Sequence, residues 1–211
     1  MRLEVERSAL LIVDVQNDFC PGGALGVPDG DAVIGPINRL SRRFKRVVAT
    51  QDWHPADHIS FASNWKGKRP GDVVDAGGLE QALWPEHCLQ GSGGAAFHPG
   101  LALEPVGLIL RKGYHRDLDS YSALYENDRK TPTGLDGYLR SLGVRRLYLA
   151  GLATDYCVYY SALDALALGY EVVLLEDAVR GVDLPAGRVQ AVLAQMREAG
   201  VAFARARDYE E

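Results

Sequence analysis

Residues 8–14 read SALLIVD: five apolar side chains follow Ser8, and the run ends in the carboxylate of Asp14. A short apolar run that stops at a charged residue is typical of a strand buried on both faces. Similar runs lie at residues 46–50, 107–110, 145–150, 171–175 and 201–204, and helical patterns lie at 32–43, 132–142, 155–168 and 187–199. Strands rich in Val, Leu and Ile that alternate with helices predict an α/β three-layer sandwich with a mostly parallel central sheet of about six strands.

Length and composition agree with this class. The 211 residues, 47% apolar and 24% charged, suit a single domain over residues 1–211 better than two small ones. A net charge of -5 without a basic cluster disfavours nucleic acid or an anionic membrane as partner, and the run at 9–13 is far too short to span a bilayer. The three cysteines form no disulfide framework, so we expect reduced thiols and a cytoplasmic protein, with the oligomeric state left open between monomer and homo-oligomer.

Reactive side chains follow the predicted strands. Asp14, Asp52 and Lys112 come directly after the first three strands, and Cys157 comes a few residues after the fourth. In open α/β sheets, ligands bind beyond the carboxyl ends of the strands. We therefore expect these four groups, from four separate parts of the sequence, to meet at one rim of the sheet.

Cys157 lies in the stretch GLATDYCV at residues 151–158. Thr154 or Asp155 is a good N-cap, which would place Cys157 in the first turn of the following helix. There the helix dipole favours a thiolate, and free amides can bind an oxyanion during acyl transfer. The alternative is an inert cysteine in the core, because thiols are often simply buried.

Asp14 and Lys112 gain a role from their expected position beside Cys157. Taken alone, each would be interpreted as an ordinary polar residue at a strand end. Beside a thiol, Asp14 can accept the thiol proton and later return it to the leaving amine. Lys112 would keep Asp14 oriented and offset its charge.

A second set of residues has the spacing of metal ligands. Asp52 and His54 alternate in the stretch DWHPADH, so an extended backbone would place them on one face, and His87 in WPEHC offers a third ligand. A carboxylate with imidazoles suits one divalent ion, Zn first and Fe or Mn as alternatives. Ordinary loop histidines are the alternative reading, although three of the five histidines lie in these two motifs. His58 is left open between a fourth ligand, a residue that supports a ligand, and a loop hydrogen-bonding group.

Residues 52–107 carry many Gly, Pro, Trp and His residues and little periodicity. A loop region of this length inside a domain is usually functional. Aromatic residues near the motifs, Phe19, Trp84 and Tyr121, are more often core than substrate walls. Next to a metal and a nucleophile they can enclose a flat ring.

The motifs at residues 14–19, 52–61, 84–88, 112–113 and 151–158 together resemble the nicotinamidase/pyrazinamidase family of the isochorismatase-like cysteine hydrolases. They occur in the family's order, across residues 8–180. The resemblance implies metal-dependent hydrolysis of nicotinamide, and also of pyrazinamide, with a role in NAD salvage. It implies that Cys157 attacks the carboxamide carbon to form a thioester, that Asp14 shuttles the proton, and that Lys112 assists.

The resemblance also implies the arrangement around the substrate. The pyridine nitrogen would bind the metal held by Asp52, His54 and His87, with Phe19, Trp84 and Tyr121 as ring contacts and His58 as an extra ligand or supporting residue. A non-proline cis peptide would fall at Leu152-Ala153. The amides of Ala153 and Cys157 would form the oxyanion hole.

Three other functions compete with this one. A cysteine hydrolase of the same superfamily could act on a carbamoyl or ureido amide, although the Asp52, His54 and His87 set favours a pyridine substrate. A vinyl ether hydrolase of the isochorismatase type need not carry the cysteine that is present here. A metal-binding or ligand-binding protein without turnover is disfavoured, because nothing is missing from the proposed triad.

Overall fold

The computed structural model describes residues 5–209 and is built on a parallel sheet. Residues 1–4 and 210–211, which the predicted domain includes, lie outside the described residues. In the described part, the sheet has six strands in the order β5 (Leu108–Lys112), β2 (Val47–Asp52), β1 (Ser8–Val13), β6 (Arg146–Leu152), β7 (Glu171–Arg180) and β8 (Ala202–Ala204). All neighbouring pairs are parallel, which confirms the predicted fold class.

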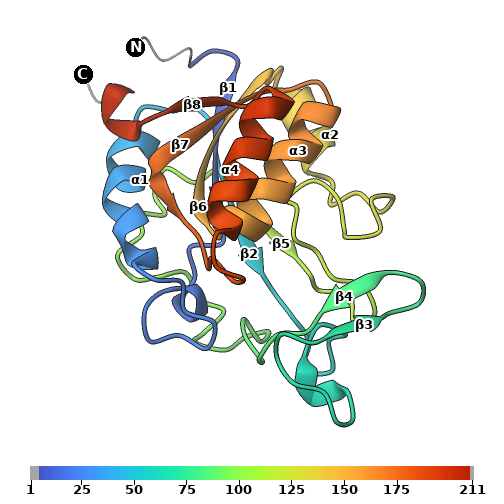
Figure 1. Cartoon of the computed structure of the whole chain (residues 1–211). Coiled ribbons are helices and arrows are strands. Elements are labelled where there is room, and N and C mark those ends of the chain that lie inside the picture. Colours follow the sequence, from blue (N-terminus) through green and yellow to red (C-terminus); the bar gives the residue numbers. More distant parts are fainter. Residues whose placement is uncertain (1–4, 210–211) are drawn as a thin grey trace.

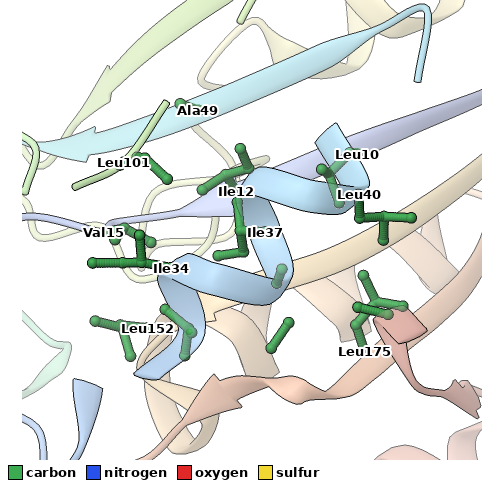
Figure 2. Packing of buried hydrophobic residues seen from close by; sticks show 14 of the residues in the cluster. Leu10, Ile12, Val15, Ile34, Ile37, Leu40, Ala49, Leu101, Leu152 and Leu175 are labelled. Atoms are coloured by element: carbon green, nitrogen blue, oxygen red, sulfur yellow. The ribbon is translucent and has the colours of Figure 1, made fainter. Parts of the chain in front are cut away.

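Helices cover both faces of the sheet (Figure 1). Helix α1 (Ile34–Ser41) packs on one face, as the close view in Figure 2 shows for its apolar side chains against Leu10 and Ile12. Helices α2 (Leu135–Ser141), α3 (Tyr159–Ala167) and α4 (Arg188–Ala199) contribute to the core of the other face, together with Leu11 and Leu149. Successive residues of a strand point to opposite faces, so uninterrupted apolar runs are what this two-sided burial requires.

The helix ends differ from the predicted ones. The helix expected over 32–43 is a 3-10 turn, Gly30–Val33, followed by α1, and the helix expected over 155–168 is a π-helical turn, Thr154–Val158, followed by α3. Further 3-10 turns lie at Asn17–Phe19, Ala62–Asn64 and Ala206–Tyr209. Hydrophobic periodicity reports a helical face but does not distinguish the tighter or wider turn at its end.

The region between β2 and β5 is largely irregular, as expected, but it contains a hairpin that the sequence analysis did not predict. Strands β3 (Val73–Asp75) and β4 (Glu80–Ala82) pair antiparallel, and the hairpin projects away from the sheet in Figure 1. Gly77 and Gly78 both have positive φ in the turn, a conformation that glycine adopts without steric cost. Single bridges, His54 to Leu89 and Phe61 to Trp84, connect the two predicted metal motifs.

The strand order explains how distant residues meet. Strands β5, β2, β1 and β6 are consecutive neighbours, so their carboxyl ends form one continuous edge. Asp52 and Lys112 are paired across β2 and β5 as the last residues of these strands, rather than the first residues after them. Asp14 follows β1 directly, with a left-handed φ of 46°. The predicted convergence at one rim is therefore built into the topology.

None of the helices in the described part of the chain is long and apolar enough to cross a membrane.

Gly151 marks a close backbone approach between two strands of the sheet. It lies in β6 opposite Val13 and has a φ of 111°. A Cβ atom at this position would lie 2.1 Å from the carbonyl oxygen of Val13, far inside van der Waals contact with backbone that cannot move freely. The two strands that carry Asp14 and the Cys157 turn therefore require glycine here.

We expect Gly151→Ala to reduce the free energy of unfolding by about 2–4 kcal/mol, because it adds a backbone clash to an unfavourable φ. Chemical denaturation measures this difference. Gly143→Ala is the matched control, since Gly143 also has positive φ, at 67°, but open space around it. It should cost only about 1 kcal/mol. Equal costs at the two positions would show that the approach to Val13 is not tight.

Candidate active site

Lys112 lies at the centre of the site and is completely buried. Its Nζ atom is 2.8 Å from Asp14 Oδ2 and donates hydrogen bonds to Asp52 Oδ1 at 2.5 Å and to the Ser120 carbonyl oxygen at 2.9 Å. The Sγ atom of Cys157 is 3.4 Å away. One ammonium thus contacts the predicted proton carrier, the predicted nucleophile and one predicted metal ligand.

The two carboxylates beside Lys112 are placed in different electrostatic environments. Burial raises the pKa of Asp14, and Lys112 offsets only part of that rise. Burial acts in the same direction on Asp52, but Lys112 and His54 together lower the pKa of Asp52 below its usual range. Asp52 therefore remains a carboxylate, whereas Asp14 is the group that can take up and release a proton.

Lys112 itself stays charged. Burial alone would lower its pKa, but Asp14 and Asp52 raise the pKa well above the ordinary value of a lysine. Asp14 is also held by Thr50, whose hydroxyl donates to Asp14 Oδ1 at 2.6 Å. Thr50 on Oδ1 and Lys112 on Oδ2 thus hold the Asp14 side chain from two sides.

Cys157 is buried in the π-helical turn between β6 and α3. Burial raises the pKa of its thiol well above 9.0, and Lys112 counteracts this only in part. Burial therefore favours the neutral thiol, whereas the helix dipole alone would favour a thiolate. The neutral thiol needs a base before it can act as a nucleophile, and Asp14 is beside it.

The start of this turn differs from the prediction. Neither Thr154 nor Asp155 caps the turn with its side chain, so the predicted N-cap is wrong. The Asp155 carboxylate instead accepts hydrogen bonds from the backbone N–H groups of Val182 and Asp183. The expected cis peptide at Leu152-Ala153 is present.

The predicted metal ligands converge. The nearest ligand atoms of Asp52, His54 and His87 all lie within 4.8 Å of one another. His54 Nδ1 is 2.7 Å from the Gly113 carbonyl oxygen and His87 Nδ1 is 2.8 Å from the Pro85 carbonyl oxygen, so both rings present Nε2 to Asp52. Backbone partners that orient histidines in this way are typical of metal sites. Burial also lowers the pKa of His87 to about 4, which keeps this imidazole neutral, as a ligand must be.

His58 lies beside this group, and its ring centroid is 4.2 Å from that of His54. Its Nδ1 is 2.7 Å from Ser60 Oγ, while its buried Nε2 has no hydrogen-bond partner among the described residues. His54, His58 and Asp119 also come within 4.8 Å of one another through their ligand atoms. An unpartnered buried imidazole nitrogen next to this donor set fits a divalent metal, or a ligand of that metal, at this place.

A cavity lies against these groups. It is lined by Phe19, Leu25, Asp52, His54, Trp84, His87, Asp119, Tyr121, Ala153, Tyr156, Cys157 and Val182. The three aromatic residues predicted as ring contacts are all among them. Trp84 Nε1 donates a hydrogen bond to the Tyr121 hydroxyl at 3.1 Å. The Trp84 ring packs edge-on against the Tyr156 ring, with 4.9 Å between the ring centroids. The cavity thus joins the predicted nucleophile to the predicted metal ligands and has aromatic walls.

Four lining residues were missed by the sequence analysis: Leu25, Asp119, Tyr156 and Val182. Tyr156 directly precedes Cys157, so its position in the motif was an available signal. Val182 follows a strand whose predicted end at 175 is five residues short of the observed end at Arg180. Asp119 is buried in a loop and accepts a hydrogen bond from Gln81 at 2.8 Å, a contact over 38 residues that no local pattern reveals.

Comparison with known proteins identifies the family to which the chain belongs. The model of the isochorismatase domain matches residues 8–208. The nicotinamidase of Acinetobacter baylyi is 46% identical over 198 residues, covering 94% of this chain and 92% of that protein. The nicotinamidase of Escherichia coli is 44% identical over 207 residues, covering 96% and 97%.

Solved structures agree. A nicotinamidase/pyrazinamidase of Acinetobacter baumanii has a TM-score of 0.94 at 46% identity, covering 98% of this chain and 99% of that one. A protein of L. infantum in complex with nicotinate has a TM-score of 0.87 at 38% identity, covering 99% and 98%. The pyrazinamidase of Pyrococcus horikoshii in complex with zinc has a TM-score of 0.77 at 38% identity, covering 94% and 99%. The chain therefore belongs to the nicotinamidase family of the isochorismatase-like hydrolases.

Proposed function

We propose that this chain hydrolyses nicotinamide to nicotinate and ammonia through a thioester on Cys157. The observation that carries the proposal is the contact of Lys112 with both Asp14 and Cys157, together with the cavity that Cys157 shares with three candidate metal ligands. The similarity to nicotinamidases over nearly the whole chain supports the same substrate. Pyrazinamide carries the same carboxamide on a related ring, so we expect it to be hydrolysed as well. The acid produced would enter NAD salvage.

The first half of the reaction forms the thioester. Asp14 accepts the proton of the Cys157 thiol, and the sulfur attacks the carboxamide carbon. The C–N bond then breaks, and Asp14 returns the proton to the nitrogen so that ammonia leaves. Lys112 keeps Asp14 in place and offsets the negative charge that passes between the carboxylate and the thiol.

The second half releases the acid. Asp14 accepts a proton from a water molecule, whose oxygen attacks the thioester carbon. The C–S bond breaks, the sulfur regains a proton from Asp14, and the acid formed releases its own proton to solvent and leaves as nicotinate. In both halves negative charge develops on the carbonyl oxygen, and the backbone N–H groups of Ala153 and Cys157 would stabilise it there.

A divalent metal, with zinc as the first candidate, would be held by Asp52, His54 and His87. When bound, it would accept the ring nitrogen of the substrate as a ligand and so orient the ring. Phe19, Trp84 and Tyr121 would enclose the ring, and His58 would add a ligand or support one.

We expect Cys157→Ala to lower the rate of ammonia release from nicotinamide by at least about a thousandfold, because no other nucleophile is proposed. Cys20→Ala is the matched control, since Cys20 is also a buried free cysteine but does not line the cavity. It should retain activity, and both variants should bind as much metal as the wild type. Substantial turnover by Cys157→Ala would contradict the thioester route.

We expect chelation to abolish ammonia release and addition of Zn, Fe or Mn to restore it, because ring orientation depends on the metal. His87→Ala should lower the metal content measured by elemental analysis. His115→Ala, at an exposed histidine away from the cavity, should not change it. Full activity after verified metal removal would show that the metal has no part in catalysis. No ammonia release with any metal, together with hydrolysis of a ureido amide, would favour the alternative substrate class.

A further inference from the structure

Asp155 is completely buried two residues before the nucleophile, yet neither half of the proposed reaction uses its carboxylate. Its Oδ1 accepts a hydrogen bond from the Val182 N–H, and its Oδ2 accepts one from the Asp183 N–H, each at 2.9 Å. A buried carboxylate is expensive unless hydrogen bonds satisfy it, and charge-assisted bonds of this type are the strong ones. Asp155 thus fastens the connection between β7 and α4, residues 181–187, to the turn that carries Cys157.

Other hydrogen bonds between the same segments are longer. The Tyr156 hydroxyl donates to the Leu184 carbonyl oxygen at 3.2 Å. Arg188 Nε donates to the Asp155 carbonyl oxygen at 3.3 Å, and its guanidinium lies 4.5 Å from the Tyr156 ring centroid. The two short bonds to the Asp155 carboxylate are therefore the principal link.

The connection makes close contacts at its first residues. A Cβ atom on Gly181 would lie 2.3 Å from Val189 Cγ2 and 3.0 Å from Asp155 Oδ1. Asp183 has a left-handed φ of 56°, and its own carboxylate accepts a hydrogen bond from the Val189 N–H at 2.9 Å. The start of the connection is thus packed between the nucleophile turn and α4, whereas residues 183–187 are exposed.

Val182 has one side in the cavity. It lines this space with Ala153 and Cys157, and it packs against the core of the face covered by α1. Its backbone N–H is the group that Asp155 holds. The position of this apolar wall therefore depends on the Asp155 carboxylate.

We propose that Val182 determines specificity for a flat six-membered aromatic amide, and that Asp155 is the positioning residue that holds Val182 against the ring. This inference rests on the proposed function for the identity of the substrate. Loss of the Asp155 contacts should weaken binding of the ring while leaving the nucleophile in place. Shortening Val182 should make room for a substituent on the ring.

The test compares Asp155→Asn with Asp183→Asn. The amide at 155 keeps one acceptor but turns an NH₂ group toward the second backbone N–H. Asp183→Asn alters the same connection without touching the nucleophile turn. We expect Asp155→Asn to raise KM for nicotinamide about tenfold, the loss of one such interaction, with kcat within about threefold of the wild type. Asp183→Asn should leave both constants near the wild-type values.

Val182→Ala should improve kcat/KM for a ring-methylated nicotinamide relative to nicotinamide itself. An unchanged preference would overturn the role of Val182. A fall in kcat for Asp155→Asn without a rise in KM would overturn the positioning role.

A second readout does not need turnover. Hydrogen exchange at the amides of residues 182 and 183 should be faster in Asp155→Asn and unchanged in Asp183→Asn. Alkylation of Cys157 by iodoacetamide, which has no ring, should proceed at the wild-type rate in both variants. Unchanged exchange, or slower alkylation in Asp155→Asn, would overturn the proposal. If the wild type does not hydrolyse nicotinamide, the proposed function fails, while exchange still decides whether Asp155 holds Val182.

Discussion

The buried ammonium of Lys112 is the charge on which the rest of the site depends. Asp14 and Asp52 are both buried beside it, and removing two carboxylates from water is costly unless they are paired. The order of β5, β2 and β1 places the lysine at the end of the edge strand and the two carboxylates at the ends of the next two. The parallel sheet thus places the two carboxylates close together, and the ammonium of Lys112 offsets the cost of burying them.

The same cation allows two chemically identical groups to differ in behaviour. Asp52 faces His54 as well as Lys112, and both favour its ionised form, which suits it to a metal. Asp14 faces a neutral thiol and a hydroxyl in a fully buried position, where burial favours the protonated form. Different surroundings separate the pKa values of two nearby acids, which is the general way in which one site obtains both a fixed charge and a proton carrier. Lys112 therefore contacts both the candidate metal ligand and the candidate proton carrier.

Much of this arrangement could be predicted from local sequence. Apolar runs that stop at or within two residues of Asp14, Asp52 and Lys112 locate these residues near strand ends, and a parallel sheet brings strand ends to one rim. The sequence does not specify which residues outside the strands complete the cavity, because their positions depend on contacts with distant residues. Asp119 lies in a loop and is held at the site by a hydrogen bond from Gln81. Val182 lies at the site because β7 continues through the charged residues 176 and 177. Asp155 is one of two N-cap candidates, with Thr154, but its carboxylate accepts a hydrogen bond from a backbone group 27 residues away, because tertiary hydrogen bonds compete with local ones.

The most direct test of the role of Lys112 is a double-mutant cycle on unfolding free energy, using the wild type, Lys112→Met, Asp14→Asn and the double variant. We expect Lys112→Met to cost about 3–5 kcal/mol, because it leaves two buried carboxylates without their cation. In that background, Asp14→Asn should restore part of the loss, since it removes one of the uncompensated charges. A Lys112→Met variant as stable as the wild type, or effects that add within about 0.5 kcal/mol, would contradict the central role of this ion group.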